Sequence, residues 1–265
     1  MRVYICVDME GVGGIVVREQ CRKGNPEYEE ARYLLIKEAN AAVDGAIEAG
    51  ADDVVVVDFH GSNLNFPLEE MHRAAKFIIG KAPRSIRFPF LDEQTDLVLL
   101  VGYHAMSGTS EAIRDHTYNS LTIEKIIING WELGEVGLDA LQCGYYGVPV
   151  GLVSGDDKVC KEAKQLLGDV ETAVVKFSVA NGCAMTYPPK VSREIVRRGA
   201  FNAVKNYKKF KPFTMNAPYV VDIKYKDTQI VDGIYVNGRD RIRMDSYTVR
   251  YYMESLADLI GKPVY

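Results

Sequence analysis

The stretch RVYICVDMEGVGG (residues 2–14) decides the fold, because it joins a buried strand to two charged side chains. Residues 2–8 form a nearly continuous apolar run, which is typical of a parallel strand covered on both faces. The run ends at Asp8, and Glu10 follows two positions later. Residues two apart in an extended chain point the same way, so both carboxylates project together where the strand ends.

Two further apolar runs repeat this pattern. DDVVVVD (52–58) leads into DFHG, and TDLVLLVGY (95–103) overlaps GYHAM. Helical apolar spacing between the first two runs completes a β–α–β unit. Later segments continue the alternation, with helices expected at 134–147 and 158–168 and strands at 148–157 and 170–177. The sequence therefore predicts an α/β fold, an open and mostly parallel sheet flanked by helices.

The C-terminal part of the chain has a different pattern. An amphipathic helix is expected over 192–207, followed by a linker at 210–218, alternating strand patterns and a final helix from about Ser246. We therefore expect an α/β core over residues 1–210. A smaller α+β extension over residues 211–265 would pack on this core. Within the core range, residues 124–133 predict a hairpin that turns at Asn129-Gly130.

Composition excludes several classes of protein. The chain has 265 residues and is 47% hydrophobic, enough for a sizeable core, and its net charge of -4 indicates neither a nucleic-acid nor a membrane partner. Five scattered cysteines without a C-x-x-C pair argue against a disulfide framework and favour a reducing, cytoplasmic compartment. The first apolar run is too short for a signal peptide, and no stretch approaches the roughly 18 apolar residues of a membrane helix.

Potential metal ligands follow each of the three buried strands. Asp8 and Glu10 follow the first, Asp58 and His60 end the second, and His104 follows the third. The carboxyl ends of parallel strands meet at one edge of a sheet, where open α/β sheets build their sites. Converging carboxylates repel one another, and a divalent cation removes that conflict. Two carboxylates and two imidazoles suit zinc, with manganese, cobalt or iron as alternatives.

A fifth donor would allow two metal ions about 3.5–4 Å apart that share a carboxylate. Glu132, Glu135 and Asp139 are the candidates, and spacing alone does not choose among them. His116, in the loop sequence DHT, is either a further ligand or an acid–base group.

Other interpretations of these motifs are weaker. Gly11, Gly13 and Gly14 follow a strand, but their register matches neither a dinucleotide fingerprint nor a P-loop. No G-x-S-x-G elbow supports a serine hydrolase. The basic stretch from Lys190 to Lys211 lies on the polar side of an amphipathic helix, which indicates a solvated face rather than an RNA site.

Five motifs in this order, VDMEG, DFHG, VGYHAM, DHT and GEVGLDA, resemble the zinc-dependent D-aminopeptidases over about residues 1–180. The resemblance implies two zinc ions per subunit, with Asp8 shared by both. The implied ligands are Asp8, Glu10, His60, His104 and Glu135. It also implies that His116 is catalytic outside the metal shell, and that the protein is a homodecamer of two stacked pentameric rings.

We therefore expect a metal-dependent aminopeptidase that hydrolyses short peptides, of D-Ala type, with a metal-activated water. One alternative is another dimetal amidohydrolase or a phosphoesterase, although the basic residues that a phosphate needs are not evident around the motifs. A second alternative is a metal-binding protein without enzymatic activity.

Overall fold

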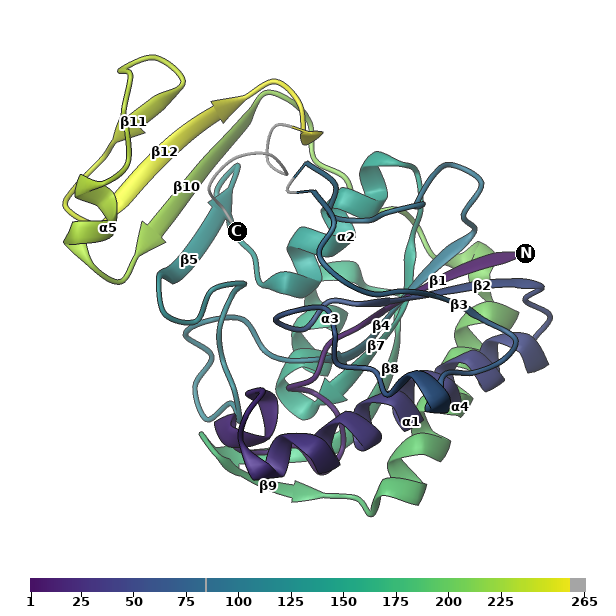
Figure 1. Cartoon of the computed structure of the whole chain (residues 1–265). Coiled ribbons are helices and arrows are strands. Elements are labelled where there is room, and N and C mark those ends of the chain that lie inside the picture. The colour runs from purple at the N-terminus through teal and green to yellow at the C-terminus, as the bar shows by residue number, and fades with distance from the viewer. Residues whose placement is uncertain (84, 258–265) are drawn as a thin grey trace.

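The centre of the molecule is a seven-stranded sheet (Figure 1). The computed structural model of the chain describes residues 1–83 and 85–257. The strand order is β3-β2-β1-β4-β7-β8-β9, and every neighbouring pair is parallel except β8 with β9. The strands are β1 (Arg2–Val7), β2 (Asp53–Asp58), β3 (Lys76–Ile78), β4 (Leu97–Tyr103), β7 (Val150–Asp156), β8 (Glu171–Ala180) and β9 (Cys183–Thr186). The predicted open, mostly parallel sheet is confirmed.

Helices cover both faces of this sheet (Figure 1). In β1, Val3, Ile5 and Val7 pack into the core with α1 and α4, whereas Tyr4 and Cys6 pack on the opposite face with α2 and α3. Both faces of the strand are buried, which explains its continuous apolar run. The helices are α1 (Pro26–Glu48), α2 (Glu135–Tyr145), α3 (Asp157–Leu167) and α4 (Pro189–Lys205), with short 3-10 helices η1 (Arg18–Cys21), η2 (Leu68–Glu70) and η3 (Tyr207–Lys209).

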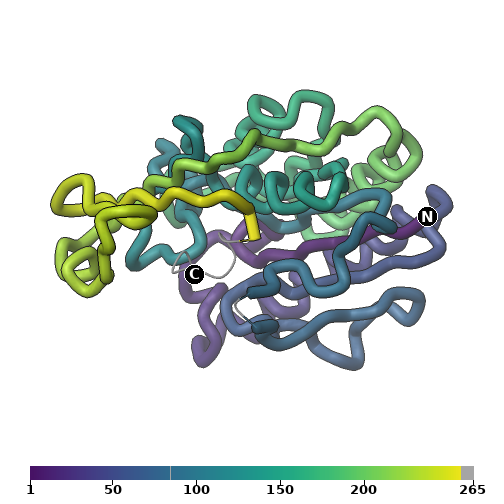
Figure 2. Tube along the Cα trace, turned by 90° about the horizontal axis from the view of Figure 1, so that it is seen from above, coloured from purple at the N-terminus to yellow at the C-terminus, as the bar shows by residue number. Residues whose placement is uncertain are grey.

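A second, antiparallel sheet forms the part of the molecule that projects from the core in Figure 2. Its order is β11-β12-β10-β5-β6, and α5 lies beside it. Asn129 and Gly130 have positive φ angles of 50° and 85° and form the predicted hairpin turn between β5 and β6. The elements are β5 (Ile123–Ile128), β6 (Trp131–Glu132), β10 (Tyr219–Tyr225), α5 (Thr228–Asp232), β11 (Arg241–Arg243) and β12 (Thr248–Met253). The smaller C-terminal α+β portion is confirmed.

The expected final helix from about Ser246 is wrong as far as residue 253. This stretch is strand β12, in which Val249, Tyr251 and Met253 are buried and alternate with more exposed neighbours. That alternation of period two suits a strand with one face on the core. Residues 258–265, the remainder of the expected helix, lie outside the described residues. The boundary between the expected core (1–210) and the expected extension (211–265) stays a prediction. The second sheet takes strands from both of these ranges.

Among the residues that the structure describes, no helix is long and apolar enough to cross a membrane. The order of the central strands places a crevice beside β1. The chain leaves β1 for β2 on one side and later returns to β4 on the other, so the loops beyond these strands diverge. Such a switch point at the carboxyl ends of parallel strands is where α/β sheets hold their ligands.

Candidate metal centre

The loop after β1 is pressed against the end of β4. The Gly11 N–H donates a hydrogen bond to the Gly102 carbonyl oxygen at 2.7 Å. A Cβ at Gly11 would lie 1.8 Å from the Tyr103 carbonyl oxygen, so no other residue allows this approach. The contact fixes the backbone directly after Glu10, whose side chain is buried beside that of Asp8.

A buried lysine stabilises the same loop through hydrogen bonds. Lys176, on β8, is fully buried and donates to the carbonyl oxygens of Glu10 at 2.6 Å and Val12 at 2.8 Å, and also to that of Ile15. Burial is the main cause that lowers the pKa of this ammonium to about 8. All three donors of Lys176 therefore serve the segment that carries the predicted ligand Glu10.

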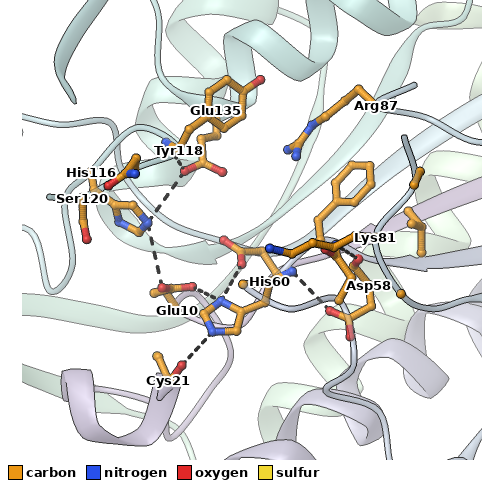
Figure 3. A pocket seen from close by; sticks show the side chains of 18 of the residues that line it. Glu10, Cys21, Asp58, His60, Lys81, Arg87, His116, Tyr118, Ser120 and Glu135 are labelled. Atoms are coloured by element: carbon orange, nitrogen blue, oxygen red, sulfur yellow. Dashed lines mark hydrogen bonds and ion pairs between the residues drawn. The ribbon is translucent and has the colours of Figure 1, made fainter. Parts of the chain in front are cut away.

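His60 presents one ring nitrogen to both carboxylates (Figure 3). Its Nε2 donates to the Cys21 carbonyl oxygen at 2.8 Å, which leaves Nδ1 directed at the site. This Nδ1 lies 3.2 Å from Asp8 Oδ1 and 3.0 Å from Glu10 Oε2. Asp58 instead accepts the backbone N–H of Asn65 at 2.6 Å and its side-chain amide at 2.9 Å, so it supports the loop rather than joining the cluster.

His104 is arranged in the same way. Its Nδ1 donates to the Ala105 carbonyl oxygen at 3.0 Å. Its Nε2 lies 3.5 Å from Asp8 Oδ2 and 3.2 Å from Glu135 Oε1. A backbone carbonyl that fixes one ring nitrogen and frees the other is the usual support of a metal-binding histidine.

Of the three candidates for a fifth donor, Glu135 is the one that lies in the cluster. Glu135 is the first residue of α2, is buried, and accepts the Tyr118 N–H at 2.8 Å. Glu132 is exposed and pairs with Lys125 at 3.1 Å. Asp139 is buried one helical turn beyond Glu135, where it accepts hydrogen bonds from the Arg87 guanidinium and from the hydroxyls of Tyr103 and Tyr118.

His116 stacks on His104 and lies beside two carboxylates of the cluster. The two imidazole rings stack with their centroids 3.8 Å apart and an interplanar angle of 9°. His116 Nε2 is 3.9 Å from Glu10 Oε1 and 3.8 Å from Glu135 Oε1 (Figure 3). One ligand atom each from His104, His116 and Glu135 lie within 4.8 Å of one another, as do atoms from Asp8, Glu10 and His104.

The unpaired atoms of this cluster match what a divalent cation binds. Asp8 Oδ2, Glu10 Oε2 and His104 Nε2 are buried and have no hydrogen-bond partner within the described residues. Unpaired buried polar atoms are costly unless something else satisfies them. Carboxylate oxygens and imidazole nitrogens at this spacing suit zinc, which binds such atoms at about 2.0–2.2 Å. The residues present therefore fit a zinc centre.

The electrostatics of the cluster point the same way. Burial and the neighbouring Glu10 raise the pKa of Asp8 to about 7. Burial opposes protonation of His104, but the carboxylates of Glu135, Asp8 and Glu10 together outweigh it, and the pKa of His104 rises to about 10. Burial and the charge of His104 lower the pKa of His116 to about 4. Crowded acids and imidazoles must share protons in this way, and a bound cation replaces those protons.

The cluster lines one wall of a cavity of about 540 Å³. Basic side chains also line this cavity, and the sequence motifs did not indicate them. They are Arg18, Arg22, Lys81, Arg87 and Arg114. The expectation that basic residues are absent around the motifs is therefore wrong. Arg114 stands only two positions before His116, and this proximity was the one available signal.

Comparisons with known proteins show the family to which the chain belongs. A family model described as D-aminopeptidase matches residues 1–262. A D-aminopeptidase of Bacillus subtilis (strain 168) is 30% identical over 259 residues, which cover 97% of this chain and 93% of that protein. The solved structure of the Zn-dependent D-aminopeptidase DppA from Bacillus subtilis, a self-compartmentalizing protease, superposes with a TM-score of 0.91 at 28% identity, over 98% of this chain and 94% of that one. The chain with this cluster of carboxylates and imidazoles belongs to the D-aminopeptidase family.

Proposed function

We propose that this D-aminopeptidase uses two zinc ions per subunit to remove the N-terminal residue of short peptides of D-Ala type. One observation carries the proposal: the two carboxylate oxygens of Asp8 face different histidines. Oδ1 lies beside His60 and Oδ2 beside His104. A carboxylate turned to two imidazoles in this way supports a shared ligand between two adjoining ions. The relative described as Zn-dependent supports the choice of metal.

The ligands that we propose are the five predicted side chains. Asp8, Glu10 and His60 form one end of the cluster, and Asp8, His104 and Glu135 form the other. When bound, zinc supplies Lewis acidity for the scissile carbonyl and makes a water more acidic. The free N-terminal amine of a peptide, in its unprotonated form, would be a further ligand for the metal, which favours cleavage at the N-terminus.

His116 is the proposed proton carrier of the reaction. Hydrolysis adds water across the C–N bond, so one proton must pass from the attacking water to the leaving amine. His116 Nε2 lies within 4 Å of Glu10 and Glu135, and its Nδ1 has no hydrogen-bond partner among the described residues. A ring held at the edge of the cluster is placed to accept that proton and return it.

The assembly that we propose is a homodecamer of two stacked pentameric rings, and its location is cytoplasmic. The likeness to a self-compartmentalizing protease supports an oligomer that encloses its active sites. Enclosure would restrict access to short peptides.

Metal analysis and turnover on one sample test the proposed function. We expect about two zinc ions per chain, and faster hydrolysis of D-Ala-D-Ala than of L-Ala-L-Ala. Bis-p-nitrophenyl phosphate is the comparison substrate for the phosphoesterase alternative. Hydrolysis of the phosphodiester without hydrolysis of either dipeptide would overturn the proposal, and so would a metal-loaded protein that hydrolyses none of the three.

A further inference from the structure

Three arginines form a group of positive charge on the wall of the cavity that holds the metal cluster. We call Arg18, Arg22 and Arg114 the arginine cluster; all three line the cavity of about 540 Å³. Arg18 and Arg22 come from η1 and the residue after it, and Arg114 comes from the loop between β4 and β5. The family motifs contain none of these three positions.

The arginines repel one another, and only Glu19, whose effect on Arg18 is smaller than that of the other two arginines, opposes this repulsion. Burial, then the charges of Arg22 and Arg114, lower the pKa of Arg18. Within the described part of the chain, none of the three makes an ion pair. Arg114 Nε is buried and has no hydrogen-bond partner. A partly buried guanidinium that lacks a partner carries a desolvation cost, which a bound anion would offset.

The cavity's fourth arginine differs in this respect. Arg87 forms hydrogen bonds to both carboxylate oxygens of Asp139 and lies over the Phe59 ring, 4.2 Å from its centroid. Its charge is therefore already matched by a carboxylate. Among the arginines of the cavity wall, the arginine cluster, and not Arg87, presents unmatched positive charge.

The arginine cluster lies next to the histidines of the metal centre. Arg114 is two residues from His116 and acts on its ring as a like charge. Arg18 belongs to the 3-10 helix that ends at Cys21, whose carbonyl oxygen accepts a hydrogen bond from His60. Acidic side chains therefore line one part of the cavity and unmatched arginines line a neighbouring part. A short peptide with a free C-terminus carries a carboxylate that complements the arginines.

We propose that the arginine cluster binds the C-terminal carboxylate of a di- or tripeptide whose N-terminal residue lies at the metal cluster. This inference rests on the proposed function. It assigns to the arginine cluster the selection of short peptides as substrates. Guanidinium groups match carboxylates in geometry and charge. The subsite makes a free carboxylate, one or two residues from the scissile bond, a determinant of specificity.

The test compares D-Ala-D-Ala with its C-terminal amide, which is uncharged at that end. The zinc-loaded wild-type enzyme should prefer the free acid in kcat/KM by about 10- to 100-fold, the range expected for hydrogen bonds to a charged group. Arg114→Met should lose most of this preference, because the kcat/KM for the free acid falls much further than that for the amide. Arg114→Glu should reverse the preference. Arg73→Met, at an exposed position outside the cavity, is the matched control and should behave as wild type.

Each outcome decides one question. Equal hydrolysis of acid and amide by the wild-type enzyme overturns the carboxylate subsite but leaves the aminopeptidase intact. A wild-type enzyme that hydrolyses neither peptide overturns the proposed function itself. If Arg114→Met slows both substrates equally, or changes the molar mass in solution, Arg114 supports the fold or a subunit contact, and the subsite is wrong. Zinc content and molar mass are therefore measured on every variant.

Discussion

Asp8 is the residue that connects the two halves of the cluster of carboxylates and imidazoles. Its Oδ1 is 3.2 Å from His60 and its Oδ2 is 3.5 Å from His104, whereas Glu135 touches only the His104 half. We therefore predict that Asp8→Ala loses both zinc ions and that Glu135→Ala loses one. Zinc per chain after dialysis, measured by inductively coupled plasma mass spectrometry, checks this.

The matched control for these two variants is Glu93→Gln, which changes an exposed carboxylate remote from the cluster. It should keep the zinc content of the wild-type protein. Full zinc content in Asp8→Ala would show that the ion lies elsewhere.

A second prediction separates the two roles open to His116. If the imidazole moves a proton, His116→Ala keeps its zinc and loses about 100-fold or more in kcat, as general acid–base groups do. The stacked contact with His104 and the distances to Glu10 and Glu135 place it for that role. Zinc content and kcat are measured together. Loss of zinc in parallel with activity would make His116 a ligand instead.

A third prediction concerns a buried acid behind the loop after β1. Glu38 is 1% exposed, and its Oε1 accepts the Gly13 N–H at 2.9 Å. Burial raises its pKa from 4.5 to about 7. Between these values the folded protein holds a proton that the unfolded chain has released, so stability falls as pH rises through this window. Glu38→Gln should therefore raise the free energy of unfolding at pH 8 by about 1–3 kcal/mol, and much less at pH 5.

Urea denaturation of wild type and variant at both pH values tests this. Glu30→Gln, an exposed change on the same helix, is the control and should alter stability at neither pH. A Glu38→Gln protein less stable than wild type at pH 8 would show that the ionised carboxylate stabilises the fold.

The sequence indicated the candidate site residues whose convergence follows from strand geometry. Asp8 and Glu10 are two apart on an extended chain, and His60 and His104 follow neighbouring parallel strands, so their convergence follows from the strand order. Spacing could not separate Glu135 from Asp139, because both lie on one face of α2. What separates them is Arg87, which neutralises Asp139 from a distant loop. The sequence did not reveal the arginine cluster, because Arg114 meets Arg18 and Arg22 only through tertiary structure.

At the scale of elements, strands buried on both faces were the easiest to predict. β1, β2 and β4 carry apolar runs that exclude most other structures. The edge strands β3 and β9, with 3 and 4 residues, carry no such run. β12 was mistaken for a helix because its exposed face carries tyrosine and arginine among apolar residues, which obscures the alternation.

A fourth prediction concerns how β8 supports the loop after β1. Lys176→Met keeps the length of the side chain but leaves the buried carbonyl oxygens of Glu10 and Ile15 without a donor, whereas that of Val12 still accepts the Ile15 N–H. We expect a loss of about 2 kcal/mol or more in the free energy of unfolding, since each unsatisfied buried group costs about 1–3 kcal/mol. Zinc affinity should fall as well, because the loop carries Glu10.

Urea denaturation and zinc titration measure these two effects. Lys161→Met, at an exposed position of α3, is the control for loss of a lysine charge. Unchanged stability and zinc affinity in Lys176→Met would show that the loop keeps its position without the ammonium group.

At the scale of the whole molecule, the fifth prediction is the size of the assembly. Ten chains of 29.6 kDa give about 296 kDa. Light scattering coupled to gel filtration should report this mass for the zinc-loaded protein. A 29.6-kDa species with full activity would contradict the decamer, although not the metal centre.

The second sheet also determines when during synthesis the enzyme becomes complete. His116 precedes the hairpin of β5 and β6 and Glu135 follows it, while β5 pairs along its other edge with β10. Ile128 leaves the ribosome roughly 90 residues before Tyr219, the first residue of β10. In a nascent chain, strand β5, which lies between His116 and Glu135, therefore has no β10 beside it until translation is nearly finished. The sheet contacts that support this segment are therefore complete only when the polypeptide is almost fully made.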